Sequence, residues 1–204
     1  MTSSPTGLSV RGHGLAALAV LLLAGPARAD WALDAGALAR VVAGGAHADV
    51  RPDPRGATGL VHGAIDIAAP PDVVWGAITD CANAARVAPG GRGCRLVERD
   101  PAGRWDVREL TVGWSPLAPP FRTRFRSEFE ARRVIRFHCV GGDVAVCFGE
   151  WRLEALPGGR TRVLYENRAT SPIPAPASMA RMAMRHNLLR SLESLRHEAE
   201  ARTR

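Results

Sequence analysis

Two side chains of this sequence could take part in acid–base chemistry, Glu109 and Tyr165. Glu109 alternates with Trp105 and Val107 along a segment with the two-residue period of a β-strand, and this parity predicts that its carboxyl group lies on an apolar face. A carboxyl group among apolar side chains has a raised pKa, which suits a general acid or base. The parity of Glu109 is ambiguous because Leu110 points to the opposite face. Glu109 and Tyr165 are therefore only candidates for an acid or base.

Other catalytic and metal-binding patterns do not occur in the sequence. No Gly-x-Ser-x-Gly elbow, Walker loop or dinucleotide-binding fingerprint is present. The histidines are scattered, and none shares a face with a second histidine or a carboxylate at the spacing of metal ligands. We therefore expect no metal and no cofactor. The histidines considered are His47, His62, His138, His186 and His197.

The sequence contains the cysteines Cys81, Cys94, Cys139 and Cys147. An even number in an oxidising compartment suggests disulfides, and four cysteines allow three connectivities. We favour Cys81 with Cys94 and Cys139 with Cys147, because each pair is local and the second falls on opposite arms of an expected hairpin. Buried free thiols are the alternative. No pair has Cys-x-x-Cys spacing, so neither a thioredoxin-like redox site nor a zinc knuckle is indicated.

The composition is that of a folded, basic protein. The chain has 204 residues, of which 46% are hydrophobic and 23% charged, and this suits one globular domain with appendages. All 27 basic residues are arginines, against 20 acidic residues, so the formal net charge is +7. The absence of lysine points to codon bias rather than to a nucleic-acid surface, and we expect no nucleic-acid partner. A row formed by Arg122, Arg124 and Arg126 could instead make transient contact with an anionic membrane surface.

Residues 1–29 have the pattern of a secretory signal peptide. A basic start is followed by an apolar block at 15–24 and by an Ala-x-Ala motif that ends at Ala29. The apolar block is shorter than the roughly 20 residues that span a membrane. We therefore predict cleavage after Ala29 and a periplasmic or secreted protein, with an uncleaved anchor as the alternative. The mature chain is expected to have an N-terminal extension over 30–57, with a short helix and a loop, and a main domain over 58–204.

The main domain is predicted to be α+β. A strand over 60–67 is followed by two short helices, the first starting at Pro71 and the second capped by Asp80. An amphipathic helix over 177–201 ends the chain. This order predicts a helix-grip fold, in which a curved antiparallel sheet of about seven strands wraps around the long C-terminal helix. The remaining strands are expected over 94–99, 105–112, 121–130, 134–140, 144–153 and 161–169.

Several motifs resemble those of a known superfamily. The stretch from Ile67 to Trp75, Ile-Ala-Ala-Pro-Pro-Asp-Val-Val-Trp, with Asp80 five residues later, resembles the opening motif of the START-like (SRPBCC) superfamily. The segments 142–143, 149–153 and 159–165 are similar to later strands of its polyketide cyclase/dehydrase and coenzyme Q-binding branch. The resemblance covers residues from near 58 to 200. It implies binding of a lipid, quinone, polyketide or other hydrophobic molecule, and it leaves catalysis open.

A bowed sheet and a straight helix cannot touch everywhere, and the gap between them is the expected ligand site. The leading hypothesis is an exported carrier or sensor of a hydrophobic small molecule. The first alternative is a cyclase or dehydrase acting on a polyketide-like substrate, with Glu109 or Tyr165 as acid or base, and the second is a structural module with a filled core. The side chains expected to bind ligand, or else to form ordinary core, are Trp105, Phe125, Phe137, Trp151, Tyr165, Met182, Leu188 and Leu192.

Overall fold

The computed structural model of the protein describes residues 31–204 except 114 and 116, and residues 32–204 form one compact unit. The predicted signal peptide at 1–29 lies outside the described residues. Within the described chain, none of the helices has the length and apolarity needed to cross a membrane. The elements are α1 (Ala35–Val42), β1 (His47–Arg51), β2 (Gly59–Ile67), α2 (Pro71–Thr79), α3 (Cys81–Val87), β3 (Gly91–Arg99), β4 (Trp105–Val112), β5 (Phe121–Glu130), β6 (Val134–Gly142), β7 (Cys147–Leu156), β8 (Arg160–Ala169) and α4 (Ala177–Ala201).

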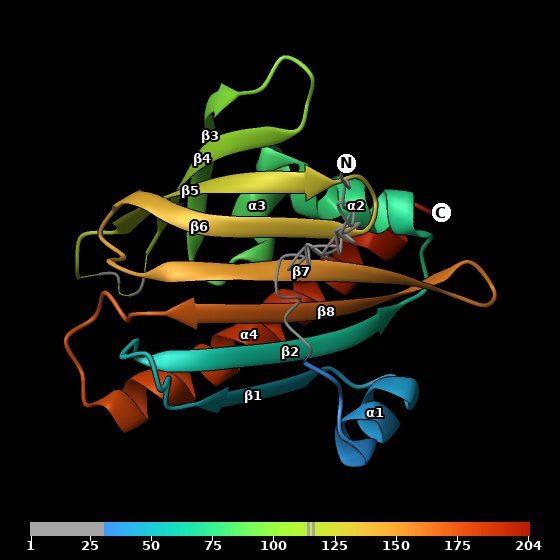
Figure 1. Ribbon diagram of the computed structural model, residues 1–204, viewed down its shortest axis with the longest axis horizontal. Coiled ribbons are helices and arrows are strands. Elements are labelled where there is room, and N and C mark those ends of the chain that lie inside the picture. The colour runs from blue at the N-terminus through green and yellow to red at the C-terminus, as the bar shows by residue number, and fades with distance from the viewer. Residues whose placement is uncertain (1–30, 114, 116) are drawn as a thin grey trace, which may run out of the picture. The chain divides into compact units, whose positions relative to one another are not determined.

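These strands form one curved antiparallel sheet in the order β1-β2-β8-β7-β6-β5-β4-β3. Strands β3 to β8 follow one another as a meander, and β2 pairs with β8 to bring the start of the domain beside its end. Helices α2, α3 and α4 lie on one side of the sheet (Figure 1). We call that side the helix face and the opposite side the outer face. The arrangement confirms the predicted α+β helix-grip fold.

The sheet has 8 strands in the described chain, rather than the predicted seven, because β1 adds an edge. This strand lies in the stretch expected as an N-terminal extension, and it pairs with β2 from His47 opposite Ala64 to Arg51 opposite Leu60. In its 5 residues, polar side chains alternate with apolar side chains that are buried or partly buried. Such a short alternation cannot be told from an adjoining loop by its pattern alone, which explains why the strand is missed.

Local signals place the two short helices between β2 and β3. Pro71 begins α2 and Asp72 lies in its first turn, where a missing N–H loses no partner and an acidic group meets the positive end of the helix dipole. Asp80 caps α3, because its carboxylate accepts a hydrogen bond of 2.9 Å from the Ala82 N–H. Both features agree with the sequence analysis.

Disulfides join Cys81 to Cys94 and Cys139 to Cys147, the two local pairs that the sequence favours. The first connects the start of α3 to β3 and therefore holds that helix over one end of the helix face. The second connects β6 to β7 across their hairpin. Closing a loop of this kind typically stabilises a folded chain by about 2–4 kcal/mol.

Helix α4 covers only part of the helix face. Among the described residues it packs on β1 and β2 and against α2 and α3, with no comparable packing on β4 to β7. Its closest approach is at Gly63 of β2, where an added Cβ would come within 2.7 Å of Leu188 Cδ2 and 3.1 Å of Leu192 Cδ1. Leu192 and Leu195 are fully buried there. The core is therefore concentrated beneath α4, near the β1–β2 edge of the sheet.

Candidate functional site

Four aromatic side chains project from the helix face of the central strands. The strand register places Phe125 of β5, Phe137 of β6, Trp151 of β7 and Tyr165 of β8 on the same side of the sheet. The ring centroids of Trp151 and Tyr165 lie 4.3 Å apart, and those of Phe137 and Tyr165 lie 6.0 Å apart in a stacked arrangement. We call these four residues the aromatic cluster. All four residues are among those predicted from the sequence to bind ligand or to form ordinary core.

Helix α2 reaches the same face beside the aromatic cluster. Its Trp75 meets Phe129 of β5 edge-on, with 5.7 Å between the ring centroids. Phe129 is in phase with Phe125 along β5, so both rings lie under the helices. Trp75 also packs against the buried core.

The aromatic cluster is deep but not sealed by the described residues. Its members keep accessible surface, whereas Val163 and Leu192 of the core have none. Burial nevertheless raises the pKa of the Tyr165 hydroxyl well above its usual value, and the neighbouring Asn167 side chain opposes that shift. Deep side chains that keep accessible surface lie next to a space that the packed core does not fill. The helix face therefore presents an aromatic surface beside the core beneath α4, and Trp151 and Tyr165 pack against that core.

A buried ion pair lies on the same face of β4. Asp106 and Arg108 are two residues apart, and the register sets Arg108 opposite Phe125 and Asp106 opposite Ser127 of β5. Only 6% of Asp106 and 7% of Arg108 is exposed. Arg108 Nε donates to Asp106 Oδ2 at 2.9 Å, and Arg108 Nη2 donates to the same oxygen. The aromatic surface is thus bordered by a charged pair that the sequence analysis does not identify.

The hydrogen bonds of this pair are incomplete. Both bonds end on Asp106 Oδ2, and Asp106 Oδ1 is enclosed without a hydrogen-bond partner among residues 31–204, apart from the undescribed 114 and 116. A buried acceptor that lacks a donor costs about 1–3 kcal/mol. A donor that reaches Oδ1 would therefore remove an existing penalty.

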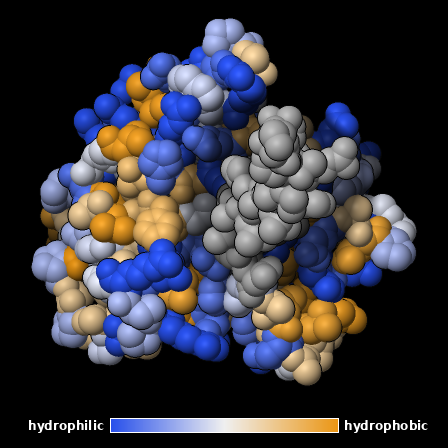
Figure 2. Space-filling model, viewed as in Figure 1, coloured by the Kyte–Doolittle hydropathy of each residue, from blue (hydrophilic) through white to orange (hydrophobic). Residues whose placement is uncertain are grey.

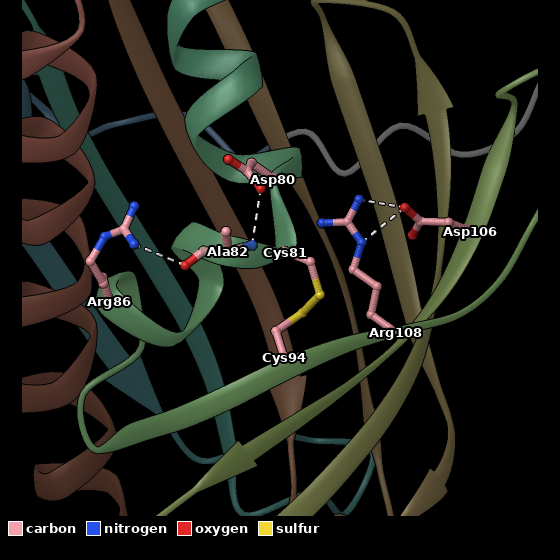
Figure 3. Close-up of a disulfide and its surroundings, with 7 residues drawn as sticks. All are labelled: Asp80, Cys81, Ala82, Arg86, Cys94, Asp106 and Arg108. Carbon is pink, nitrogen blue, oxygen red and sulfur yellow. Dashed lines mark hydrogen bonds and ion pairs between the residues drawn. A yellow bond between two sulfur atoms is a disulfide. The ribbon is translucent and has the colours of Figure 1, made fainter.

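Figure 3 shows what surrounds the pair. The Arg108 side chain rises from β4 with the Asp106 carboxylate on one side and the Cys81–Cys94 disulfide on the other, below the junction of α2 and α3 at Asp80. Arg108 Nη1 points away from Asp106 and forms no hydrogen bond to any described residue. Since the disulfide ties α3 to β3, it holds α3 over the β3 end of the sheet.

Glu109 and Trp105 lie on the outer face, so their predicted place in an apolar cavity is wrong. The register sets Trp105 opposite Glu128 and Glu109 opposite Arg124. Glu109 Oε2 accepts from Arg124 at 2.9 Å, and Oε1 accepts from Arg95 at 3.1 Å. Hydrogen bonds from Arg124 and then Arg95 lower the pKa of Glu109, whereas the sequence analysis expects it to be raised. Glu109 is therefore not suited to act as an acid in a ligand cavity.

The error concerns the phase of β4 and not its existence. The strand places a charged pair inside and Trp105 outside, against the usual pattern in which apolar residues face the core. Outside, the Trp105 ring is covered by the guanidinium carbon of Arg126, 3.9 Å from the ring centroid. This cation–π contact explains how a large aromatic ring is accommodated on a polar surface.

The α4 candidates lie outside the aromatic cluster, although Trp151 and Tyr165 pack against the core that contains Leu188 and Leu192. Met182 is 67% exposed, so it lies on the solvent side of the helix and its predicted contact with ligand is not supported by its position. Leu188 and Leu192 are buried over Gly63 in the core between α4 and β2. The candidate site consequently consists of sheet residues, with α2 and α3 at its border.

The arginine row of β5 lies on the outer face among acidic partners. Arg124 pairs with Glu109, and Arg126 lies 3.5 Å from Glu128. In Figure 2, charged and apolar residues are interspersed on the face of the molecule shown. The row is therefore part of a mixed surface and not of an unbroken positive field.

The described residues contain no group of three or more His, Cys, Asp or Glu side chains that could hold a metal ion. His62 of β2 and Glu166 of β8 approach one another on the outer face, with 3.3 Å between Nε2 and Oε2. Burial lowers the pKa of His62. Two such ligands alone do not form a metal site.

Comparison with known proteins supports the fold. Residues 67–196 match the family described as "Polyketide cyclase / dehydrase and lipid transport". A search of curated proteins finds no match. Among solved structures, a STAR-related lipid transfer protein from Xanthomonas axonopodis is 17% identical, with a TM-score of 0.65 over 76% of this chain and 94% of that one.

Two further solved structures share the architecture. The Zhui aromatase/cyclase from Streptomyces sp. R1128 is 20% identical, with a TM-score of 0.58 over 78% of this chain and 97% of that one. The lipid transfer and protein localization domain of human StarD13 is 12% identical, with a TM-score of 0.58 over 76% of this chain and 84% of that one. At these identities the likeness shows the fold alone.

The position of Glu109 can be tested by titration. We expect carbon-detected NMR to give a Glu109 pKa below its usual value, because the two guanidinium groups favour the ionised form. Arg124→Met should raise that pKa. A carboxyl group whose pKa is lower in the folded state stabilises the protein at pH values above the pKa that the group has in the unfolded state. This contribution is lost as the pH falls through the folded-state pKa. Glu109→Gln should therefore make the acid loss of stability less steep, and a wild-type Glu109 pKa above its usual value would contradict its place on the outer face.

Proposed function

The chain belongs to the polyketide cyclase / dehydrase and lipid transport family, and on that premise we propose that it binds a hydrophobic small molecule on the aromatic cluster of its helix face. A lipid, a quinone or a polyketide-like molecule would fit this description. The proposed role is that of a carrier or sensor, which shelters the molecule from water without changing it.

The observation that carries the proposal is the aromatic cluster itself. The Tyr165 ring lies against Trp151 and is stacked with Phe137 on the helix face, and all three side chains keep accessible surface. A ligand laid on these rings would remove apolar area from water at about 25 cal/mol per Å². Rigid rings also provide contact area at a low cost in conformational entropy. Such a surface suits a molecule that is flat or mainly apolar.

We propose in addition that the protein acts outside the cytoplasm. Support comes from the signal-peptide pattern of 1–29 and from the two disulfides of the folded part, because disulfides persist in oxidising compartments. Intact-mass measurement of the protein recovered from its natural compartment tests this. The expected mature chain begins at Asp30, and a full-length chain retained in the cytoplasm would contradict export.

Transient contact with an anionic membrane is proposed for ligand pick-up. The mature chain keeps its excess of arginine over acidic residues, although the β5 row is largely paired. We therefore expect weak pelleting with vesicles that contain anionic lipid, and loss of that pelleting when salt is raised, because exposed charges are screened. Pelleting that does not respond to salt would contradict an electrostatic contact.

A cyclase or dehydrase activity is the second candidate, and the ionisable groups of the helix face favour it. Asp106, Arg108 and Tyr165 lie on the same face of the sheet as the aromatic cluster. However, the raised pKa of Tyr165 keeps its hydroxyl group protonated near neutral pH, so it can donate a hydrogen bond but cannot serve as a ready base. Mass analysis of a polyketide-like ligand after incubation distinguishes the two functions: a carrier returns it unchanged, and an enzyme does not.

Paired alanine substitutions test the binding surface. Phe137→Ala removes a ring from the aromatic cluster and should weaken binding of the neutral dye Nile red about tenfold or more, since the contact area of one buried aromatic side chain is lost. Phe148→Ala removes the same side chain from the outer face of β7, where Phe148 is 37% exposed. This control should leave the affinity nearly unchanged.

Fluorescence titration of the three proteins measures the effect, with thermal unfolding as a check that each variant is folded. Equal affinities for wild type and a folded Phe137→Ala protein would show that the aromatic cluster is not the binding surface. A larger loss with Phe148→Ala would move the site to the outer face.

A further inference from the structure

We propose that the free edge of β3 pairs with the same edge of a second copy of this chain, so that two sheets join through two antiparallel β3 strands. The edge in question is formed by residues 95–99, which we call the β3 edge. This inference goes beyond ligand binding, because β4 separates the β3 edge from the aromatic cluster on β5 to β8.

The two edges of the sheet differ in how they are covered. Strand β1 ends the sheet on one side, and α4 packs on it. Strand β3 ends the sheet on the other side (Figure 1), where α3 is tied to its first half through Cys94. Every residue of the β3 edge is exposed, and apart from their pairing with β4 its backbone groups form no backbone hydrogen bond to a described residue. Such an edge is a template for a further strand.

A bulge places two opposite charges on the same face of the β3 edge. Val97 is an extra residue that the register with β4 skips between Leu96 and Glu98. Because of this residue, Arg95 and Glu98 both point to the outer face despite their odd spacing. Glu98 forms no ion pair with any described residue, and the Arg95 side chain stays 65% exposed beside Glu109. Both charges are therefore accessible to a partner.

The sequence of the β3 edge is complementary to itself. When two copies pair antiparallel about a two-fold axis perpendicular to the sheet, residues opposite one another point to the same face. An axis between Leu96 and Val97 sets Arg95 of each copy opposite Glu98 of the other. The pairing then forms a salt bridge on each side of the axis. Charges and bulges protect an edge from strands of other sequences, so the same features make this pairing selective for a second copy.

The apolar residues between the two charges support the same arrangement. Leu96 is 43% exposed and Val97 is 38% exposed in the single chain. At the two-fold axis, Leu96 of one copy lies opposite Val97 of the other, so pairing removes apolar surface from water. The contact is small because each copy contributes one short segment. We therefore expect a dimer that dissociates at low protein concentration rather than a permanent one.

Charge reversal at the β3 edge tests the inference by sedimentation velocity. We expect the wild-type protein to change from monomer to dimer between about 1 and 200 µM. Glu98→Arg brings like charges together on both sides of the axis and should weaken the dimer about tenfold or more. Arg95→Glu should weaken it to a similar extent for the same reason. An equimolar mixture of the two variants should dimerise as well as wild type, because a basic residue then faces an acidic one at both positions.

The matched control is Glu193→Arg on α4, where the Glu193 side chain is 51% exposed. This variant changes the net charge as Glu98→Arg does and should leave the dimer unchanged. Thermal unfolding checks that each variant is folded. If a charge variant does not fold, Leu96→Ser with Val97→Ser takes its place and should also weaken the dimer. Hydrogen exchange locates the contact, since backbone amides of the β3 edge should exchange more slowly in the dimer than in the Glu98→Arg protein.

A dimer that each charge variant weakens and that their mixture restores supports the inference. A wild-type protein that stays monomeric over the whole concentration range would overturn it. A dimer that is unchanged in the folded Glu98→Arg protein, or one whose β3 edge amides gain no protection, would place the contact elsewhere and overturn it as well. None of these results affects the binding of Nile red, so the proposed function stands or falls separately.

Discussion

The contact between α4 and β2 is the constraint on which the rest of the structure depends. Gly63 lets Leu188 and Leu192 approach the strand closely, and this fixes the straight helix over the β1–β2 edge of a curved sheet. The helix does not then pack comparably on β4 to β7, and β5 to β7 carry three of the four residues of the aromatic cluster. The same contact that builds the core therefore leaves the neighbouring surface to α2, α3 and any bound molecule.

Elements with a strong hydrophobic periodicity could be predicted from the sequence. Which face of β4 lies inside could not be predicted, because both faces of that strand carry apolar and charged residues. The bounds of α4 and of β5 match their predicted ranges, because long runs of regular spacing have one interpretation. Strand β4 has Asp106 and Arg108 in phase with Leu110, so neither of its faces is clearly apolar in the sequence. Only cross-strand pairing with β5 decides that the charged residues lie inside and Glu109 outside.

The aromatic part of the candidate site could be found from strand parity, whereas its polar part required coordinates. Phe125 and Tyr165 stand in strands whose opposite faces carry mainly charged side chains, which indicates their direction. A buried ion pair has no such signature, since Asp and Arg in a strand usually face water. The family includes both cyclases and lipid transport proteins by its description, so the fold does not choose between carriage and chemistry. The side chains on the helix face must supply that choice.

The central claim is that the helix face of this protein holds a hydrophobic guest. Native mass spectrometry of the protein isolated without denaturation tests it most directly, because a non-covalent ligand adds its own mass to that of the chain. We predict an added mass that is released on unfolding and that belongs to a mainly apolar molecule. A chain that carries no added mass, and that still carries none after incubation with excess long-chain alcohol, would contradict it.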